Sequence, residues 1–533
     1  MVLLALLCAA LQAQPREPLG KLSFPNSGAA SAQPDFIRGV AWLHSFGYEE
    51  AIDAFRAAQA ADPSFALAYW GEAMCFNQPL WFAEEPEKGS AALAKLGATA
   101  EARLARAGTP RERLYLDAVH ALYGAGDTRT RYSAYADRMA ALVKAHPEDD
   151  EAQAFYALAL LAQLPRGDAA VPLRQKAGAI VEGVFKRNPQ HPGAAHYILH
   201  AYDHPQLAAK ALPAARAYAK IAPASSHALH MPAHAFVQLG LWHEAAASDQ
   251  ASWDASVQWA ARRKLSIAMR DYHSLGWLQY AWTQQGRFAK AREAITLVEQ
   301  AMKVITPGGH VGGHHYGEES AIGRGSGPAA LRNDRGSMRA RYVLESERWS
   351  EMKGQGSFDN LDELFVLGMS AWKLGDRQRL LAAVMEFEKL VSSPPQPELR
   401  EQATVMLHQL GALLMWFEGK RQEAFAALDR AAAAQARMPK PIGRPYPVKG
   451  ADELYGELLL EAGRPKDALV WFDRALARTP NRSRAVLGLA RAAERAGDRV
   501  KSREAYKQFL ANWRLADPDL PEVQEARAGL ARP

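Results

Sequence analysis

The feature that most constrains the fold is a run of histidines that recurs after 34 residues. His196, His200 and His204 are spaced four apart, so on a helix they lie along one face. His230 and His234 follow His196 and His200 at one displacement, since 230 − 196 and 234 − 200 both equal 34. A fixed displacement of this length predicts repeated helical hairpins, with imidazoles on equivalent faces of neighbouring repeats.

The histidines are concentrated in one part of the chain. Twelve of the sixteen lie between His191 and His315, where an even distribution would place about four. His227 begins the second histidine segment, and His273 has the matching place on a later predicted helix. This concentration indicates a function that needs imidazole.

Composition excludes several classes of protein. Hydrophobic residues make up 48% of the chain and charged residues 23%, which is typical of a soluble globular protein. The net charge of +6 comes from 64 basic and 58 acidic residues without a Lys/Arg block, so we expect no nucleic-acid partner. No nucleotide-binding motif is present, so we expect no nucleotide cofactor.

The first thirteen residues form a short apolar run that ends in a small residue, as in a signal peptide. The run is too short to span a bilayer, and we expect an exported protein, periplasmic or extracellular, without a transmembrane segment. A lipoprotein anchored at Cys8 is less favoured, because the preceding Leu7 is bulky where a lipobox takes a small residue. Once the leader is removed only Cys75 remains, which leaves His, Asp and Glu as metal ligands.

Pattern and composition divide the chain into eight segments. We expect a signal peptide at 1–13, a linker at 14–34, an N-terminal helical array with a His-rich groove at 35–305, a Gly- and His-rich loop at 306–328, further helical hairpins at 329–438, a rigid Pro-rich connector at 439–450, C-terminal repeats at 451–515 and a tail at 516–533.

The helical pattern resembles the tetratricopeptide repeat (TPR) family. The small, aromatic and proline positions of that repeat are matched near one end by Gly39, Trp42, Ala51, Phe55 and Pro63. Near the other end they are matched by Gly456, Ala468, Phe472, Ala475 and Pro480. The pattern continues 34 residues later with Ala490, Ser502 and Tyr506. The resemblance implies an all-α solenoid of about eight to ten stacked hairpins, an α–α superhelix whose first helices line a concave groove.

The resemblance places His44 and the central histidines in that groove. We expect His196 and His200 to face His230 and His234 and to enclose one transition-metal ion, with His204 as a further ligand. Secondary candidate ligands are His227, His273, His314, His315 and Asp203, of which Asp203 either binds the metal or orients an imidazole. Imidazole ligation without thiolates suits Zn, Cu, Ni or Fe. The alternative is that these histidines are polar contacts of a peptide-binding groove or part of the core.

Two further features bear on the groove. The segment 306–328 has eight glycines between Gly308 and Gly327, and we favour a lid over the groove, with a plain surface loop as the alternative. After it, Arg332, Arg335 and Arg339 follow at helical spacing. They form either a docking stripe for an anionic ligand or a solvated helix face.

Two functions therefore stay open, and no catalytic residue is assigned. The first is an exported scaffold that binds a peptide, protein or small ligand in its groove, with a His-rich metal site in the central repeats. The second is a metal-dependent enzyme that catalyses an oxidation or a hydrolysis under the Gly-rich loop.

Overall fold

Helices make up nearly all regular structure in the computed structural model, which describes residues 18–532 apart from 82, 306–327, 355–356 and 394–396. The short strands β1 (Asn77–Gln78) and β2 (Ala83–Glu84) form one antiparallel pair. Over these described residues, no helix has both the length and the apolar character needed to cross a membrane.

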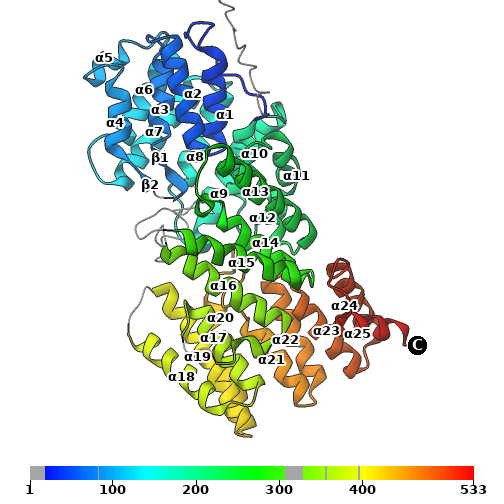
Figure 1. Cartoon of the computed structure of the whole chain (residues 1–533). Helices are drawn as coiled ribbons and strands as arrows, with labels where there is room; N and C mark the ends of the chain where they lie inside the picture. The colour runs from blue at the N-terminus through cyan, green and yellow to red at the C-terminus, as the bar shows by residue number, and fades with distance from the viewer. Residues whose placement is uncertain (1–17, 82, 306–327, 355–356, 394–396, 533) are drawn as a thin grey trace, which may run out of the picture.

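Successive helices form antiparallel hairpins that stack along the molecule (Figure 1). The N-terminal helices are α1 (Gln33–His44), α2 (Tyr48–Ala61), α3 (Ala66–Met74), α4 (Pro86–Ala94), α5 (Ala100–Leu104), α6 (Pro110–Leu122), α7 (Thr128–Ala145), α8 (Asp150–Leu161) and α9 (Val171–Arg187). The central helices are α10 (Pro192–Ala201), α11 (Leu212–Ile221), α12 (Ser226–Gln238), α13 (Trp242–Arg262), α14 (Tyr272–Gln284) and α15 (Phe288–Val304). The C-terminal helices are α16 (Pro328–Ser346), α17 (Leu361–Lys373), α18 (Arg377–Ser392), α19 (Pro397–Phe417), α20 (Arg421–Arg437), α21 (Ala451–Glu461), α22 (Pro465–Arg478), α23 (Ser483–Ala496), α24 (Arg499–Asn512) and α25 (Pro521–Ala531).

The hairpins close because an aromatic ring on the second helix rests on a glycine of the first. Phe55 in α2 lies so close to Gly39 in α1 that a Cβ at Gly39 would be 2.8 Å from the ring. Phe472 in α22 packs against Gly456 in α21 in the same way, at 2.9 Å. The sequence analysis used these same residues to predict repeats at both ends of the chain. The predicted all-α solenoid is confirmed.

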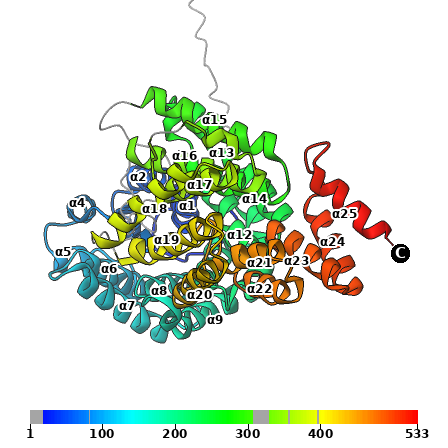
Figure 2. The same cartoon turned by 90° about the horizontal axis from the view of Figure 1, so that it is seen from below.

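The array folds back, so that its C-terminal repeats pack against the central ones. The Trp242 indole N–H donates to the carbonyl oxygen of Asn481 at 2.8 Å, and the Asp517 N–H donates to the carbonyl oxygen of Gly286 at 3.0 Å. Figures 1 and 2 both show α23 beside the central helices. The turns that follow α12 and α14 therefore pack against the end of the same chain.

Two predicted segments differ from the structure. The described part of the 14–34 segment is packed rather than an extended linker, because Phe24 is only 2% exposed and lies in an aromatic cluster of the first repeats. The 516–533 segment is not a plain tail, because it contains α25, where Gly529 packs under the Tyr506 ring. In both cases a few apolar or small residues supply the packing.

Candidate metal centre

Six histidines on three successive first helices form two clusters of three. Cluster 1 consists of His196 and His200 on α10 and His227 on α12, and cluster 2 consists of His230 and His234 on α12 and His273 on α14. Within each cluster, the three candidate ligand atoms lie within 4.8 Å of one another. In each cluster, two histidines spaced i, i+4 come from one helix. The third histidine is the second residue of the first helix in the following hairpin.

The ligand register differs from the predicted one, in which His196 would face His230. Instead, Nε2 of His196 lies 2.8 Å from Nε2 of His227 and 3.0 Å from Nε2 of His200. His227 precedes His230 by three residues, so the facing helices are offset by about one turn from their repeat equivalence. The 34-residue displacement in the sequence does not reveal this offset. The structure has two three-histidine clusters where a single four-histidine site was expected.

The surroundings of His196 fix which of its nitrogens faces cluster 1. Its Nδ1–H donates to the main-chain carbonyl oxygen of His44 at 2.6 Å. A carbonyl oxygen can only accept, so Nε2 carries the lone pair of the neutral ring. Burial lowers the pKa of His196 to about 3 and the pKa of His200 well below its ordinary value. Both rings are therefore neutral near pH 7, the form in which imidazole binds a metal.

Carboxylates orient the imidazole pair of cluster 2. Nδ1 of His230 lies 2.6 Å from Oδ1 of Asp249, and Nδ1 of His234 lies 3.0 Å from Oδ2 of Asp203. When the two Nδ1 atoms carry the ring protons and donate them to these carboxyl oxygens, the two Nε2 atoms, 3.1 Å apart, face each other with lone pairs. Such an approach is repulsive unless a proton or a cation lies between the two nitrogens.

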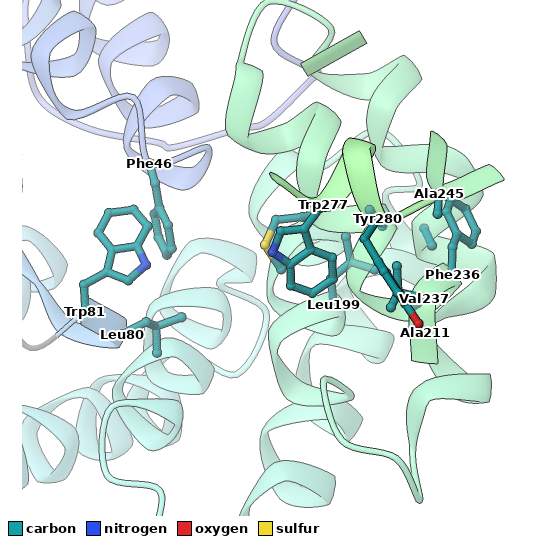
Figure 3. Packing of buried hydrophobic residues seen from close by; sticks show 14 of the residues in the cluster. Phe46, Leu80, Trp81, Leu199, Ala211, Phe236, Val237, Ala245, Trp277 and Tyr280 are labelled. Atoms are coloured by element: carbon teal, nitrogen blue, oxygen red, sulfur yellow. The ribbon is translucent and has the colours of Figure 1, made fainter. Parts of the chain in front are cut away.

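Aromatic rings close both clusters. The Phe46 ring lies 5.3 Å from the His227 ring and also contacts the other two imidazoles of cluster 1. Trp81 meets His227 edge-on at 5.6 Å, and Trp277 stacks on His234 at 4.4 Å. In Figure 3, Phe46 and Trp81 lie close together at the left, and Trp277 lies near the centre of the view. These rings shield the histidines from bulk water.

A third buried group, formed by His44, Glu151 and His191, supports cluster 1. Nδ1 of His191 accepts the Ala194 N–H, so its Nε2–H donates to Glu151 at 3.1 Å. Nε2 of His44 lies 2.6 Å from the other Glu151 oxygen, while its Nδ1 faces the Tyr197 hydroxyl at 3.0 Å. Burial opposes ionisation of Glu151, but the two histidines outweigh it and lower its pKa to about 2. The group is a hydrogen-bonded brace, and His44 is buried in it rather than exposed in the groove.

Other predicted site residues lie elsewhere. His204 is outside both clusters and pairs with Asp168 at 3.2 Å, because α10 ends at Ala201 and the four-residue helical spacing stops there. Asp203 contacts His234, which is the orienting position that the sequence offered as an alternative to direct ligation. His314, His315 and residues 306–327 of the predicted lid lie outside the described residues.

Two of the three arginines of the predicted anion-docking stripe are paired with acidic residues of the protein itself. Arg335 forms an ion pair with Asp359, and Arg339 pairs with Glu363 at 3.2 Å, while Arg332 is exposed. The acidic residues at the start of α17 supply the charge that a ligand would otherwise bring.

Sequence reasoning missed Asp249 and Phe46. Asp249 occupies a buried position on the face of α13 that otherwise presents Ala245, Ser252 and Trp253. An acidic residue in such a stripe is costly unless it is paired, and that signal could have found it. Phe46 lies in a turn with a φ of 55°, which no pattern of helical spacing reveals.

Comparisons with known proteins agree with the fold and add no function. Residues 459–530 match the model described as Tetratricopeptide repeat. No curated protein sequence matches the chain.

Several solved structures share low sequence identity with the chain. The human IFIT1 dimer with m7Gppp-AAAA is 12% identical over 92% of this chain and 91% of that one, with a TM-score of 0.33. The APC/C hetero-tetramer Cut9-Hcn1 is 10% identical over 96% and 78% of the two chains, with a TM-score of 0.30. A tetratricopeptide repeat protein from Parabacteroides merdae is 12% identical over 57% and 97%, with a TM-score of 0.27. At such TM-scores these likenesses say nothing about function.

The sequence match covers only the C-terminal repeats, whereas the hairpin structure extends over the whole array. Helical hairpins follow one another from α1 to α24, and a ring-on-glycine contact recurs at Phe55 and Phe472. Together they show an all-α array of tetratricopeptide-like hairpins, of which residues 459–530 match the repeat model.

Proposed function

We propose that the central repeats bind two transition-metal ions, one in each histidine cluster. The observation that supports this most is the position of the Nδ1 atoms of His196, His230 and His234, each of which faces an oxygen acceptor outside its cluster. Outer acceptors of this kind fix the tautomer of ligating histidines and turn Nε2 towards the ion.

The nitrogen separations suit coordination. A metal–nitrogen bond of about 2.0 to 2.1 Å places neighbouring ligand atoms about 2.9 to 3.4 Å apart around one ion. The Nε2 atoms of His196 and His227 are 2.8 Å apart, and those of His230 and His234 are 3.1 Å apart. Little movement is needed to seat an ion between them.

A cation in cluster 2 would also explain Asp249. Burial, with Asp271 nearby, raises the pKa of Asp249 well above its ordinary value. A positive charge on the imidazole of His230 would favour the ionised carboxylate and strengthen its hydrogen bond. Ligation by three imidazoles suits Zn, Cu, Ni or Fe.

The number of ligands favours a reactive metal as a second function. Structural zinc sites use four protein ligands, whereas catalytic sites use three and keep a position for water or substrate. Each cluster here brings three histidines together. A metal-dependent oxidation or hydrolysis thus remains the alternative to a scaffold that holds metal and binds a protein, peptide or small ligand in its groove.

Titration of the metal-stripped full chain with Zn²⁺, Cu²⁺ or Ni²⁺ tests the proposal. We expect two equivalents for the wild type and one for each of His200→Ala and His273→Ala, since each variant disables a different cluster. His243→Ala and His408→Ala are matched controls outside the clusters and should keep two equivalents. Unchanged stoichiometry in both cluster variants would refute the two-cluster assignment.

A further inference from the structure

A cavity separate from the histidine clusters lies where the central repeats meet the C-terminal ones. It has a volume of about 140 Å³ and is bounded by α12, the Pro-rich segment 439–450 and the end of α22. A cavity of about 150 Å³ is large enough for a benzene-sized molecule. We propose that this cavity binds a small organic anion, a carboxylate on a ring or short chain that also carries a hydroxyl or amine.

The anionic group is inferred from two cations that form no direct ion pair within the described residues, although the Asp452 carboxylate acts on Arg478 at longer range. Arg478 donates to the carbonyl oxygens of Met438 at 3.3 Å and Pro439 at 2.7 Å, and Lys440 donates to the carbonyl oxygen of Ala477 at 2.8 Å. Within the described part of the chain, neither cation has a carboxylate oxygen within 4 Å. Because Arg478 is half-buried, a carboxylate in the cavity would gain a charge-assisted hydrogen bond that solvent weakens little.

The hydroxyl or amine is inferred from Gln238. Its Nε2 donates to Oδ1 of Asp203 at 2.7 Å, which fixes the amide orientation because a carboxylate only accepts. Its Oε1 is buried and has no hydrogen-bond partner among the described residues, in a side chain that is 8% exposed. A buried acceptor left unpaired is unfavourable, and an O–H or N–H of the ligand would satisfy it once the amide turns towards the cavity, because Oε1 itself has almost no exposed surface.

The apolar body is inferred from the rest of the lining. Trp242 and Tyr280 meet edge to face at 5.6 Å, and Pro441 adds an apolar surface. The Trp242 indole N–H already donates to Asn481, and the Tyr280 hydroxyl faces Arg482 at 3.3 Å. The ring carbons of these two side chains therefore form the apolar wall, and the Tyr280 hydroxyl, which accepts from Arg482, keeps its own O–H to donate.

Anion binding in this cavity does not require a metal ion in either histidine cluster. Gln238 is linked through Asp203 to His234 of cluster 2, but none of the groups that would hold the anion is a candidate metal ligand. Binding can therefore be measured on metal-stripped protein, and its failure would leave the metal proposal untouched.

The test uses four probes on the metal-stripped full chain, with affinity measured by ligand-observed NMR and calorimetry. We expect 4-hydroxybenzoate to bind more tightly than benzoate, and phenol and inorganic phosphate to bind least. Arg478→Met should weaken 4-hydroxybenzoate by about 10- to 100-fold, and Gln238→Met should reduce its affinity to that of benzoate. Lys466→Met, an exposed residue at the other end of α22, is the matched control.

Further variants separate charge from structure, because Arg478 also holds the segment 439–450 in place. Lys440→Ala removes a charge from an exposed side chain and should weaken the binding of both 4-hydroxybenzoate and benzoate. Arg478→Lys should bind them with intermediate affinity. Phenol binding as tightly as the carboxylates would overturn the proposal. So would unchanged affinity in Arg478→Met and Gln238→Met, or no binding of any probe at millimolar concentration, which would leave water as the occupant.

Discussion

The Nδ1–H of His196 donates to the main-chain carbonyl oxygen of His44, which lies 152 residues earlier in the chain. The last residue of α1 thereby fixes the tautomer of an imidazole on α10, and Phe46 in the turn that follows contacts that imidazole at 4.4 Å. Cluster 1 is therefore completed by the first repeat, although all its histidines belong to the central ones.

The carboxylates behind cluster 2 should control its metal affinity. Replacing Asp249 or Asp203 by Asn removes the charge that supports the Nδ1–H of His230 or His234. We expect metal affinity at one site to fall about 10- to 100-fold with two equivalents still bound at saturation. Competition with a chromophoric chelator measures the change. Asp473→Asn, which alters an exposed pair with Lys501, should have no effect, and wild-type affinity in both cluster variants would contradict the assigned role.

The metal-free protein should lose stability in acid through His196. Its pKa is about 3 in the folded protein and about 6.5 in the unfolded chain, so between these values the unfolded state binds more protons. Stability is complete above pH 6.5 and falls as the pH drops towards 3, by about 2 kcal/mol at pH 5. Urea unfolding at pH 7 and pH 5 measures this, and His196→Gln should flatten the dependence.

Glu151 provides a separate window for the same experiment. Its pKa is lowered to about 2, so its contribution is present above about pH 4.5 and is lost only below that value. A loss of stability between pH 6.5 and 5 that is unchanged in His196→Gln would contradict the assignment to the imidazole.

Phe472→Ala should destabilise the C-terminal repeats. The ring is fully buried, and a Cβ at Gly488 would lie 2.3 Å from it, so the substitution leaves a cavity between α21 and α23. We expect a cost of about 3 to 5 kcal/mol. Since repeat stability depends on nearest neighbours, hydrogen exchange should accelerate in 451–512 before the central repeats respond. Uniform acceleration throughout the array would show that it unfolds as a single unit.

Arg482 should couple the C-terminal repeats to α16. It is 2% exposed and forms ion pairs with Glu345 at 2.7 Å and Glu453 at 2.5 Å. Arg482→Met leaves the buried Glu345 carboxylate without its cation, while Glu453 keeps Lys449 at 2.8 Å, and should cost about 3 to 5 kcal/mol, measured by chemical denaturation. Adding Glu345→Gln should recover part of the loss. If the double variant is no more stable than the single one, Glu345 is not the group that Arg482 neutralises.

The sequence predicted the fold because repeat packing is local. Gly39 with Phe55, and Gly456 with Phe472, are close in sequence and meet within one hairpin, so their spacing alone predicts the contact. The fold-back of the C-terminal repeats joins residues such as Trp242 and Asn481, 239 positions apart. The repeat period of the sequence does not predict a contact between residues so far apart.

The candidate site was predictable in its residues and unpredictable in its grouping. The helical spacing of His196 with His200 and of His230 with His234 is visible in the sequence and survives in the structure. Which imidazole completes each pair depends on the stagger of neighbouring helices, which the 34-residue period does not specify. The outer partners of these histidines depend on tertiary packing, and only Asp203 was foreseen.

The central claim is that the chain holds two transition-metal ions on six histidines, and the most direct measurement is the metal content of protein purified without an affinity tag. Elemental analysis of the untagged full chain, after saturation with each candidate metal and removal of the excess, should give two ions per chain with at least one of them. It should give no more than residual metal when His200→Ala and His234→Ala are combined. Wild-type protein that retains no ion of any metal, or a double variant that retains both, would contradict the account.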